Sequence, residues 1–500
     1  MFEWKGMLAG WESTILFVLL LFLLIVLFAP GRRPPNFPPG LPMLPLLGSL
    51  LHMQGISLRG LLRKLKKEYG NMASFGVFGT GVVLVSKMSI IKEVYSHKAS
   101  AGRPPMILGA TRNYLLSDGK EGDLGLLGGT GPHWVELRRF LLRHLRDFGI
   151  GKTSCEPMIR AEVEELLEHI KNQNGQPIVM EHLFHRSVLN VLWGMVTGSR
   201  FKYGDKKLAK TLESFVKLAD INLVSIIFFI PGVVKAMMYL PMLDRFVKPI
   251  GNICKFIREE IENYRSKKDW ENIHSLLTLY LTEMKKYNGD HPIFNEHQLR
   301  AVMFEMFAAG MATTASTLTM GMYLVAKHPD VQQRVHQELD EVIGRERLPC
   351  YADLESLPYT RATIHEVQRV LNLIAFVVHC ALEDCNFEGY DIPKGTVFLA
   401  NMEDAMTDPK LWKNPDEFDP NNFLDDNGKY VKNGAFVPFG IGKRQCVGEA
   451  LARMEVFVFL SSLFQKFTFT LVGEEVPPGN LYTFNAPVEF NAVAHVRPHL

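Results

Sequence analysis

The chain has 500 residues, 47% of them apolar, and a formal net charge of only +2. A chain of this length and composition can bury a substantial core without disulfide bonds, and a nearly balanced charge without a basic tail argues against nucleic acid as a partner. The six cysteines form no Cys-x-x-Cys pair, which removes the basis for a zinc-ribbon or thioredoxin-like protein and fits a reducing compartment. There is no internal repeat and no linker after about residue 45, so residues 46–500 are expected to form one large domain.

The first 45 residues predict a membrane anchor followed by a spacer. Thr14–Ala29 is an uninterrupted apolar run, and with its neighbours it is just long enough to cross a bilayer, which takes roughly 17–25 residues. A cleaved signal peptide is the alternative, but the run ends at Pro30 without a small-x-small cleavage pattern. Arg32 and Arg33 follow, so the positive-inside rule leaves the remaining chain in the cytoplasm. We therefore expect an uncleaved anchor at residues 1–30 and a semi-rigid, proline-rich hinge at residues 31–45.

Helical patterns dominate from Leu58 onward, and strand-like runs such as Gly81–Val85 and Thr396–Ala400 are few. The pattern predicts a mainly α fold with a small β region. Its longest helix is expected at Glu296–Lys327, closed by His328-Pro329, with a length of about 48 Å at 1.5 Å per residue. The middle of this helix, Ala308–Ala315, carries small and hydroxyl side chains. Either another helix packs closely there, or something large and flat lies against that face.

The strongest chemical signal is Cys446, which follows a glycine-containing stretch and precedes an apolar, helix-period stretch from Ala450 to Phe464. A lone cysteine is usually an inert, small, buried apolar residue. Here Gly440 and Gly442 allow a tight turn with positive φ, so the backbone can approach a ligand closely.

The expected charge at Cys446 points the same way. The start of a helix, with its unpaired N–H groups and its dipole, favours a thiolate. Arg444 adds a nearby cation, and Gly448 removes bulk where a planar ring would press. Thiolate ligation of iron is the chemistry that this arrangement suits.

The residues Phe439, Gly442, Arg444, Cys446 and Gly448 complete the pattern Phe-x-x-Gly-x-Arg-x-Cys-x-Gly, and through it the chain resembles the cytochromes P450. The resemblance covers essentially the whole chain, and stretches such as 137–140 and 145–152 look most similar to the animal microsomal family-2 group, arthropod members above all. It implies a triangular, mainly α heme-thiolate fold with a small β region, preceded by one transmembrane helix. It also implies a heme b cofactor held by Cys446 as the axial iron ligand, with Phe439 and Gly442 beside it.

Other motifs fall where the family has them. Glu366 and Arg369 stand three residues apart on one helix face and can pair. By themselves they would form an ordinary surface ion pair, but the resemblance implies a buried, structural pair. Trp134 and Arg138 match the family's Trp-x-x-x-Arg helix and would contact a heme propionate, because a buried carboxylate needs charged or N–H donors. By the same resemblance, His379 and Arg444 are expected to bind the propionates.

Two positions depart from the family pattern. Ala312 replaces the acid of the central helix, although Thr313 keeps the hydroxyl that the family uses in oxygen activation. Either the substrate or a water chain supplies the proton, or the chemistry needs no dioxygen; Glu305, about two turns earlier, is a weak surrogate acid. Asn422 replaces the cation that usually joins Glu366 and Arg369, and it can still donate one or two hydrogen bonds. The replacement of a cation by Asn422 suggests a lower stability of the fold rather than a change in the reaction.

The resemblance implies a monooxygenase that inserts one oxygen atom from O2 into a lipophilic small molecule, such as a steroid, terpenoid, fatty acid or xenobiotic. Alternatives are an isomerase or dehydratase of the same fold that needs no O2, and a heme protein that binds ligands without turnover. The pocket is expected to involve Ser100–Gly131, the central helix near Ala309 and Thr313, the strand after His379 and the apolar segment Asn222–Met242.

The expected location is the endoplasmic reticulum membrane, single-pass, with the catalytic domain in the cytoplasm. The implied electron donor is NADPH–cytochrome P450 reductase, with cytochrome b5 as a further possibility. Lys and Arg side chains expected on the proximal face would attract such acidic partners; they are Arg139, Arg143, Arg146, Lys152 and Lys443.

Overall fold

The computed structural model describes residues 33–45, 47–104, 107–119, 122–180, 183–219, 244–473 and 490–498, together with Val18 and Leu21. Apart from those two residues, the predicted anchor lies outside the described residues, and so does the predicted pocket segment Asn222–Met242. Among the residues that are described, no helix has both the length and the apolar character needed to cross a bilayer. The chain divides into two compact units, one of Met1–Met106, Leu223–Pro231 and Val377–Asn401, the other of Ile107–Asn222, Gly232–Phe376 and Met402–Leu500.

The first unit contains the four-stranded sheet, in the order β1-β2-β7-β4. Strand β2 pairs antiparallel with β1 across a turn in which Phe78 and Gly79 both have positive φ, and it pairs parallel with β7. Val82–Val85 are fully buried because sheet neighbours flank the strand and both of its faces are covered. The strands predicted at Gly81–Val85 and Thr396–Ala400 are thus confirmed, and the structure shows that they are direct neighbours. The elements of this unit are α2 (Leu50–Met53), α3 (Leu58–Tyr69), β1 (Met72–Val77), β2 (Thr80–Val85), α4 (Met88–Ser96), η1 (Lys98–Ser100), β4 (Phe376–Cys380), β5 (Cys385–Phe387), β6 (Tyr390–Ile392) and β7 (Val397–Asn401).

The second unit is helical, with one small antiparallel sheet in the order β3-β9-β8. Its longer elements are α5 (Ile107–Leu116), α7 (Gly131–Asp147), α8 (Glu156–Lys171), α9 (His185–Thr197), α10 (Lys206–Ala219), α13 (Asp244–Arg265), α14 (Leu276–Lys286), α15 (Glu296–Lys327), α16 (Pro329–Val342), α17 (Pro358–Leu371), α19 (Glu449–Lys466), β8 (Phe467–Val472) and β9 (Asn491–Val496). The short ones are α6 (Gly125–Gly128), η2 (Thr153–Cys155), β3 (Ile178–Val179), η4 (Trp270–Asn272), η5 (Tyr351–Ser356), α18 (Met402–Met406), η6 (Pro420–Phe423) and η7 (Gly442–Arg444). The mainly α fold with a small β region is confirmed.

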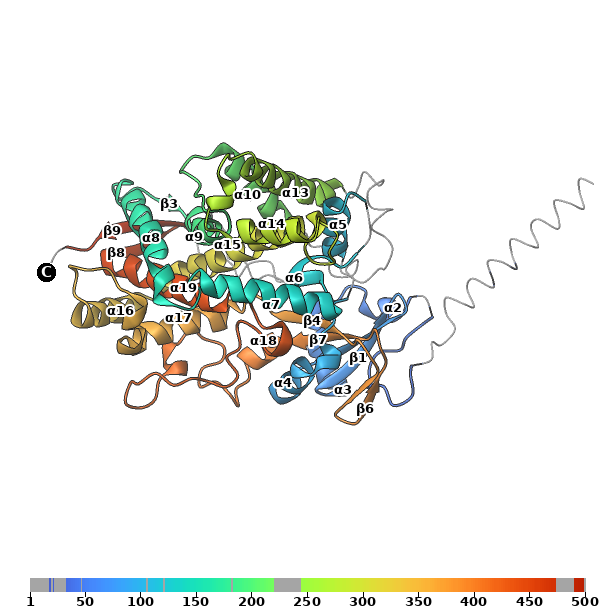
Figure 1. The fold of residues 1–500 in the computed structure, drawn as a ribbon. Helices are drawn as coiled ribbons and strands as arrows, with labels where there is room; N and C mark the ends of the chain where they lie inside the picture. Colours follow the sequence, from blue (N-terminus) through green and yellow to red (C-terminus); the bar gives the residue numbers. More distant parts are fainter. Residues whose placement is uncertain are drawn as a thin grey trace, which may run out of the picture. The chain divides into compact units, whose positions relative to one another are not determined.

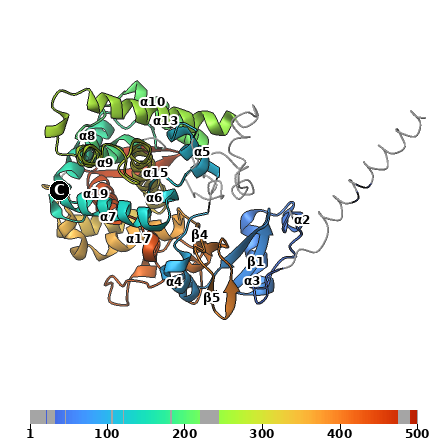
Figure 2. The same ribbon diagram turned by 45° about the vertical axis from the view of Figure 1, so that its right-hand side comes forward.

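Helix α15 is the centre of this unit, with α10 and α13 on one side and α17 on the other (Figures 1 and 2). Asn295 caps it by accepting a hydrogen bond from the N–H of Gln298 at 3.0 Å, and the helix ends at Lys327 just before His328-Pro329. Both predicted bounds are therefore confirmed. The small residues of its middle serve close packing on one face, because a Cβ at Gly310 would lie 2.1 Å from Leu192 Cδ2 of α9. On another face Ala309 is exposed and Thr313 is only partly buried, although Met311 and Ala315 are fully buried.

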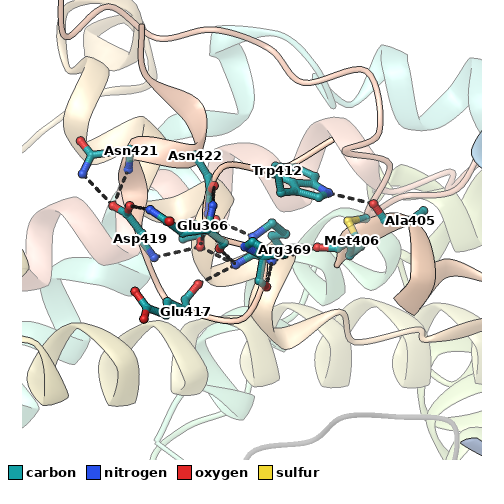
Figure 3. Close-up of polar contacts among 11 residues, drawn as sticks. Glu366, Arg369, Ala405, Met406, Trp412, Glu417, Asp419, Asn421 and Asn422 are labelled. Carbon is teal, nitrogen blue, oxygen red and sulfur yellow. Dashed lines mark hydrogen bonds and ion pairs between the residues drawn. The ribbon is translucent and has the colours of Figure 1, made fainter. Parts of the chain in front are cut away.

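Glu366 and Arg369 of α17 form a fully buried ion pair, as the resemblance implies (Figure 3). Arg369 Nε and Nη2 bond the two carboxylate oxygens at 2.8 and 2.7 Å, and the remaining N–H groups donate to backbone carbonyls between residues 406 and 417. Glu366 Oε1 also accepts from the N–H of Asp419 at 3.0 Å and from Asn422 Nδ2 at 3.1 Å. Asn422 donates to Asn414 O as well, so the predicted donor role of this amide is confirmed.

Truncation of Glu366 should be far more destabilising than truncation of an exposed glutamate in the same spacing. Glu366→Ala leaves Arg369 buried without its counter-charge, which costs about 3–5 kcal/mol. Glu262 forms an i, i+3 pair with Arg265 at the surface, so Glu262→Ala should cost at most about 1 kcal/mol. Thermal unfolding of the two purified variants measures the difference. Equal losses would contradict the structural role of the buried pair.

Candidate functional site

Cys446 stands at the end of a tight loop immediately before α19. Gly440 and Gly442 have φ of 72° and 73°, as the sequence predicts, and the N–H of Cys446 donates to Phe439 O at 3.0 Å. The short helix η7 precedes the cysteine, and α19 begins three residues after it, at Glu449. Cys446 is exposed and makes no disulfide bond, so its sulfur is open to a ligand.

The electrostatic prediction for Cys446 is only partly right. Desolvation is the largest influence and raises the pKa of the thiol, even though the residue is exposed on one side. The N–H groups of Gly448 and Glu449 bond the sulfur and lower the pKa, and so does Arg138, whereas the negative charge of Glu449 raises it. Arg138, which the sequence analysis did not connect with the thiol, is thus a cation that acts on the sulfur. Because the pKa is raised on balance, a thiolate here is favoured once a metal ion takes the sulfur.

Three predicted site residues gather beside this loop. The guanidinium carbon of Arg444 lies 3.6 Å from the centroid of the Trp134 ring, and that of Arg138 lies 5.7 Å from it. Arg138 donates to Gln445 O at 2.5 Å, which joins α7 directly to the residue before Cys446. Trp134 and both arginines therefore gather in one place, next to the cysteine loop.

The helix α6, which the sequence analysis missed, links this cluster to α15. Trp134 Nε1 and Arg444 Nη1 both donate to Leu126 O, at 3.0 and 3.1 Å. Glu305 of α15 accepts from the N–H of the same Leu126 at 2.5 Å and from that of Leu127 at 3.0 Å. The glycines at the ends of the Gly125–Gly129 run were the available signal, since a Cβ at Gly125 would lie 2.4 Å from Glu305 Oε1.

Glu305 is not a surrogate for the missing acid of α15. Its carboxylate forms a buried ion pair with Arg112 of α5, at 2.5 Å from Nη1, in addition to its two backbone bonds. A carboxylate that accepts three hydrogen bonds from fixed donors is committed to a structural role. The sequence interpretation of Glu305 was wrong because nothing in the local pattern showed that Arg112 would face it.

Thr313 and Ala312 lie on the partly exposed face of α15. Thr313 Oγ1 donates to Ala309 O at 2.8 Å, and its atoms are accessible at that point. Ala312 offers no group that could donate or accept a proton. The neighbouring Thr314 points to a different partner, Glu455 of α19, whose fully buried carboxyl has its pKa raised well above the usual range by desolvation.

His379 belongs to the other compact unit. It is buried on β4, with its ring centroid 4.2 Å from that of Tyr95. Its expected contact with a heme propionate stays a prediction.

Comparison with known proteins agrees with this arrangement. A family model described as Cytochrome P450 matches residues 38–487. Cytochrome P450 2J3 of Rattus norvegicus is 36% identical over 98% of this chain and 97% of its own length. Cytochrome P450 2J1 of Oryctolagus cuniculus is 37% identical over 93% of this chain and 91% of its own, and cytochrome P450 2D14 of Bos taurus is 34% identical over 95% of both.

Fold and site together define a heme-dependent oxidoreductase. The match covers most of the chain, and the sequence prediction of the family is confirmed. The chain belongs to the cytochrome P450 family and is similar to its animal microsomal family-2 members, which makes it a monooxygenase with heme as its cofactor.

The residues fit heme. Cys446 is exposed and makes no disulfide bond. Arg138 and Arg444 lie beside the cysteine loop and are the cations that would suit the two carboxylates of a buried macrocycle, whereas the single N–H of Trp134 is bonded to Leu126 O. The small side chains of Ala309 and Ala312 leave room beside α15 for a planar group.

Removal of the Glu305 carboxylate should loosen α6. Glu305→Ala leaves Arg112 buried without its partner and two N–H groups of α6 without their acceptor, at a cost of about 3–5 kcal/mol. Glu296 on the same helix pairs with Arg265 and Arg300 in a more exposed setting, and Glu296→Ala should cost at most about 1 kcal/mol. Thermal unfolding and limited proteolysis between residues 122 and 130 measure the two effects. If the α6 segment is as protease-resistant in Glu305→Ala as in the wild type, Glu305 does not hold α6 in place and the prediction is wrong.

Proposed function

We propose that Cys446 is the axial ligand of the heme iron and that the chain is a membrane-anchored monooxygenase acting on a lipophilic small molecule. The accessible Cys446 sulfur at the end of the Phe439–Gly448 loop carries this proposal. A thiolate-ligated heme supplies dioxygen activation by donating electron density that favours O–O cleavage. Trp134, Arg138 and Arg444 orient the group through its propionates, and the Glu366–Arg369 pair keeps the preceding loop in place.

Thr313 is proposed as the catalytic hydroxyl. Its proton is held by Ala309 O, so the lone pairs of Oγ1 are the part that can accept a hydrogen bond from water or from a substrate hydroxyl. To pass its proton onward, the Thr313 hydroxyl must break its hydrogen bond to Ala309 O and then take a new proton from the water or the substrate hydroxyl. Because Ala312 has no proton to give and Glu305 is committed to Arg112, water or the substrate supplies that proton.

The proposed electron donor is NADPH–cytochrome P450 reductase, with cytochrome b5 as a second partner. Arg139, Arg143 and Arg146 are exposed along one face of α7. Lys152 is exposed shortly after this helix ends, and Lys443 is exposed in the cysteine loop. Val135 and Leu142 are exposed on the same helix, at 44% and 37%, which gives the charged face an apolar component. Such a surface suits an acidic flavoprotein, whose association would weaken with salt.

The apolar run Thr14–Ala29 followed by Arg32-Arg33 supports a single-pass anchor in the endoplasmic reticulum membrane, with residues 46–500 as the cytoplasmic heme-thiolate catalytic domain and residues 31–45 as the hinge. A lipophilic substrate would reach such an enzyme through the membrane. The substrate class proposed is an apolar small molecule, which a steroid, a terpenoid, a fatty acid or a xenobiotic would satisfy.

Replacement of Cys446 tests the ligand assignment. The reduced, carbon-monoxide-bound protein should show the red-shifted Soret band of thiolate-ligated heme, and Cys446→Ala should lose it because the Phe439–Gly448 loop carries no other sulfur. Cys350→Ala, which alters a half-buried cysteine of the same unit, is the matched control and should keep the band. If Cys446→Ala keeps the band unchanged, Cys446 is not the heme ligand and the proposal is wrong.

Restoring the acid beside Thr313 tests the proton route. Ala312→Glu should raise the fraction of NADPH consumption that ends in product and lower peroxide release, because general acid assistance is worth about 10²–10⁴-fold where it is used. Ser316→Glu, which places the same acid one turn further along the helix, should not improve coupling. If the protein instead turns its substrate over under nitrogen without reductase, it is an isomerase or dehydratase, and the monooxygenase mechanism fails. A protein that binds ligand but shows no turnover in either condition would be a non-catalytic heme protein.

A further inference from the structure

A cavity of about 240 Å³ lies within the helical unit, next to the chain that follows the cysteine loop, since Glu449 at the start of α19 belongs to its lining. It is bounded by η5, α17, the first turns of α19 and the chain from residue 430 to 436. Its walls include the rings of Tyr351, Tyr430 and Phe436 and the side chains of His365 and Gln368. Three cations also line it, namely Arg361, Lys432 and Arg453.

The positive charge of this cavity is only partly balanced. Among the described residues, Glu449 is the one carboxylate in its lining, and its two oxygens are taken by Arg453 Nε at 2.9 Å and by Gln445 Nε2 at 2.7 Å. Arg361 pairs with Glu355 at 2.6 Å, but Glu355 is 76% exposed and does not line the cavity. In the part of the chain that the structure describes, Lys432 has no carboxylate or hydrogen-bond partner.

Several donors of the lining are also without an acceptor among the described residues. The side-chain amide of Gln368 has none, although this residue is only 8% exposed. Arg361 Nε is buried and has no hydrogen-bond partner. A buried donor without an acceptor is costly, so Arg361 Nε favours a ligand that accepts hydrogen bonds.

The pair His365–Tyr430 adds a further donor. His365 Nδ1 lies 2.7 Å from the Tyr430 hydroxyl, and His365 Nε2 lies 3.5 Å from Arg453 Nη1. Since an arginine can only donate, the tautomer with its proton on Nδ1 fits both contacts, and the hydroxyl proton of Tyr430 is left to donate elsewhere.

The surroundings of His365 report the same excess of positive charge. Burial is the largest influence on its pKa, and Arg453, Arg361 and Lys432 add to it, which together lower the pKa to about 3. The imidazole is therefore neutral at physiological pH and does not itself add to the positive charge.

We propose that this cavity binds a small organic anion, with its phosphate or carboxylate group on Lys432, Arg361 and the Gln368 amide, and its apolar body against the ring of Tyr351. Tyr430 is already in contact with Arg361, whose guanidinium carbon lies 4.0 Å from the ring centroid, and it is stacked with Phe423. Tyr351 is therefore the aromatic wall that accounts for the organic part. The volume limits the ligand to about one aromatic ring with its acidic group. The lining contains none of the residues proposed to hold the heme, so the site does not depend on the function proposed above.

Phenyl phosphate is the probe, titrated calorimetrically into the full-length, detergent-solubilised holoprotein. We expect saturable binding that phenol, which lacks the anion, does not reproduce, and weaker binding of inorganic phosphate, which lacks the ring. Lys432→Ala and Arg361→Ala should each weaken the affinity for phenyl phosphate about tenfold or more, the effect of losing one charge-assisted hydrogen bond.

Lys429→Ala is the matched control, because Lys429 is an exposed lysine three residues from Lys432 that does not line the cavity. It should bind phenyl phosphate as the wild type does. The carbon-monoxide spectrum of each reduced variant reports whether the fold and the heme site are intact. Absence of saturable binding to the wild type, or equal affinity in Lys432→Ala, Arg361→Ala and wild type, would overturn the proposal.

Discussion

The buried Glu366–Arg369 pair fixes the path of the chain that leads to Cys446. A buried guanidinium is tolerated only when its charge is balanced and its N–H groups are bonded. Arg369 meets both needs by pairing with Glu366 and by donating to backbone carbonyls between residues 406 and 417 (Figure 3). This segment between α18 and η6 contains little regular structure, so the ion pair of α17 takes the place of a hydrogen-bonded ladder in holding it. Asn422 adds two further bonds in place of the family's usual cation.

Helix α15 has to satisfy opposite demands on its two faces. Gly310 and Gly321 bring it close to α9 and α19, where a Cβ would lie within 3 Å of a leucine side chain. Ala309 and Thr313 stand on the accessible face, where small volume and one hydroxyl are the useful properties. Both demands select small residues, and this is why the Ala308–Ala315 stretch supports two explanations in the sequence. The structure confirms the close packing at Gly310, and the large flat group on the other face stays a prediction.

Charged groups beside the site are mostly committed to holding backbone in place. Glu305 accepts from the N–H groups of Leu126 and Leu127 in α6, and Arg444 with Trp134 donates to Leu126 O, so that α15 and the cysteine loop are joined through this short helix. In the proposed mechanism, proton supply at Thr313 is consequently left to water or substrate. In the cavity beside His365, by contrast, the buried Nε of Arg361 has no hydrogen-bond partner among the described residues.

The sequence by itself determined the features that depend on neighbouring residues: the bounds of α15, set by Asn295 and His328-Pro329, the positive-φ turn before Cys446, and the i, i+3 spacing of Glu366 and Arg369. These follow from local sterics, capping and helix periodicity. Only the tertiary structure decided that Glu305 is bound to Arg112, 193 positions away, that Arg138 acts on the sulfur, and that Asn422 completes the buried pair. Such contacts join residues that are distant in sequence, and because the charge of a side chain says nothing about which distant group will face it, no local pattern could have assigned them.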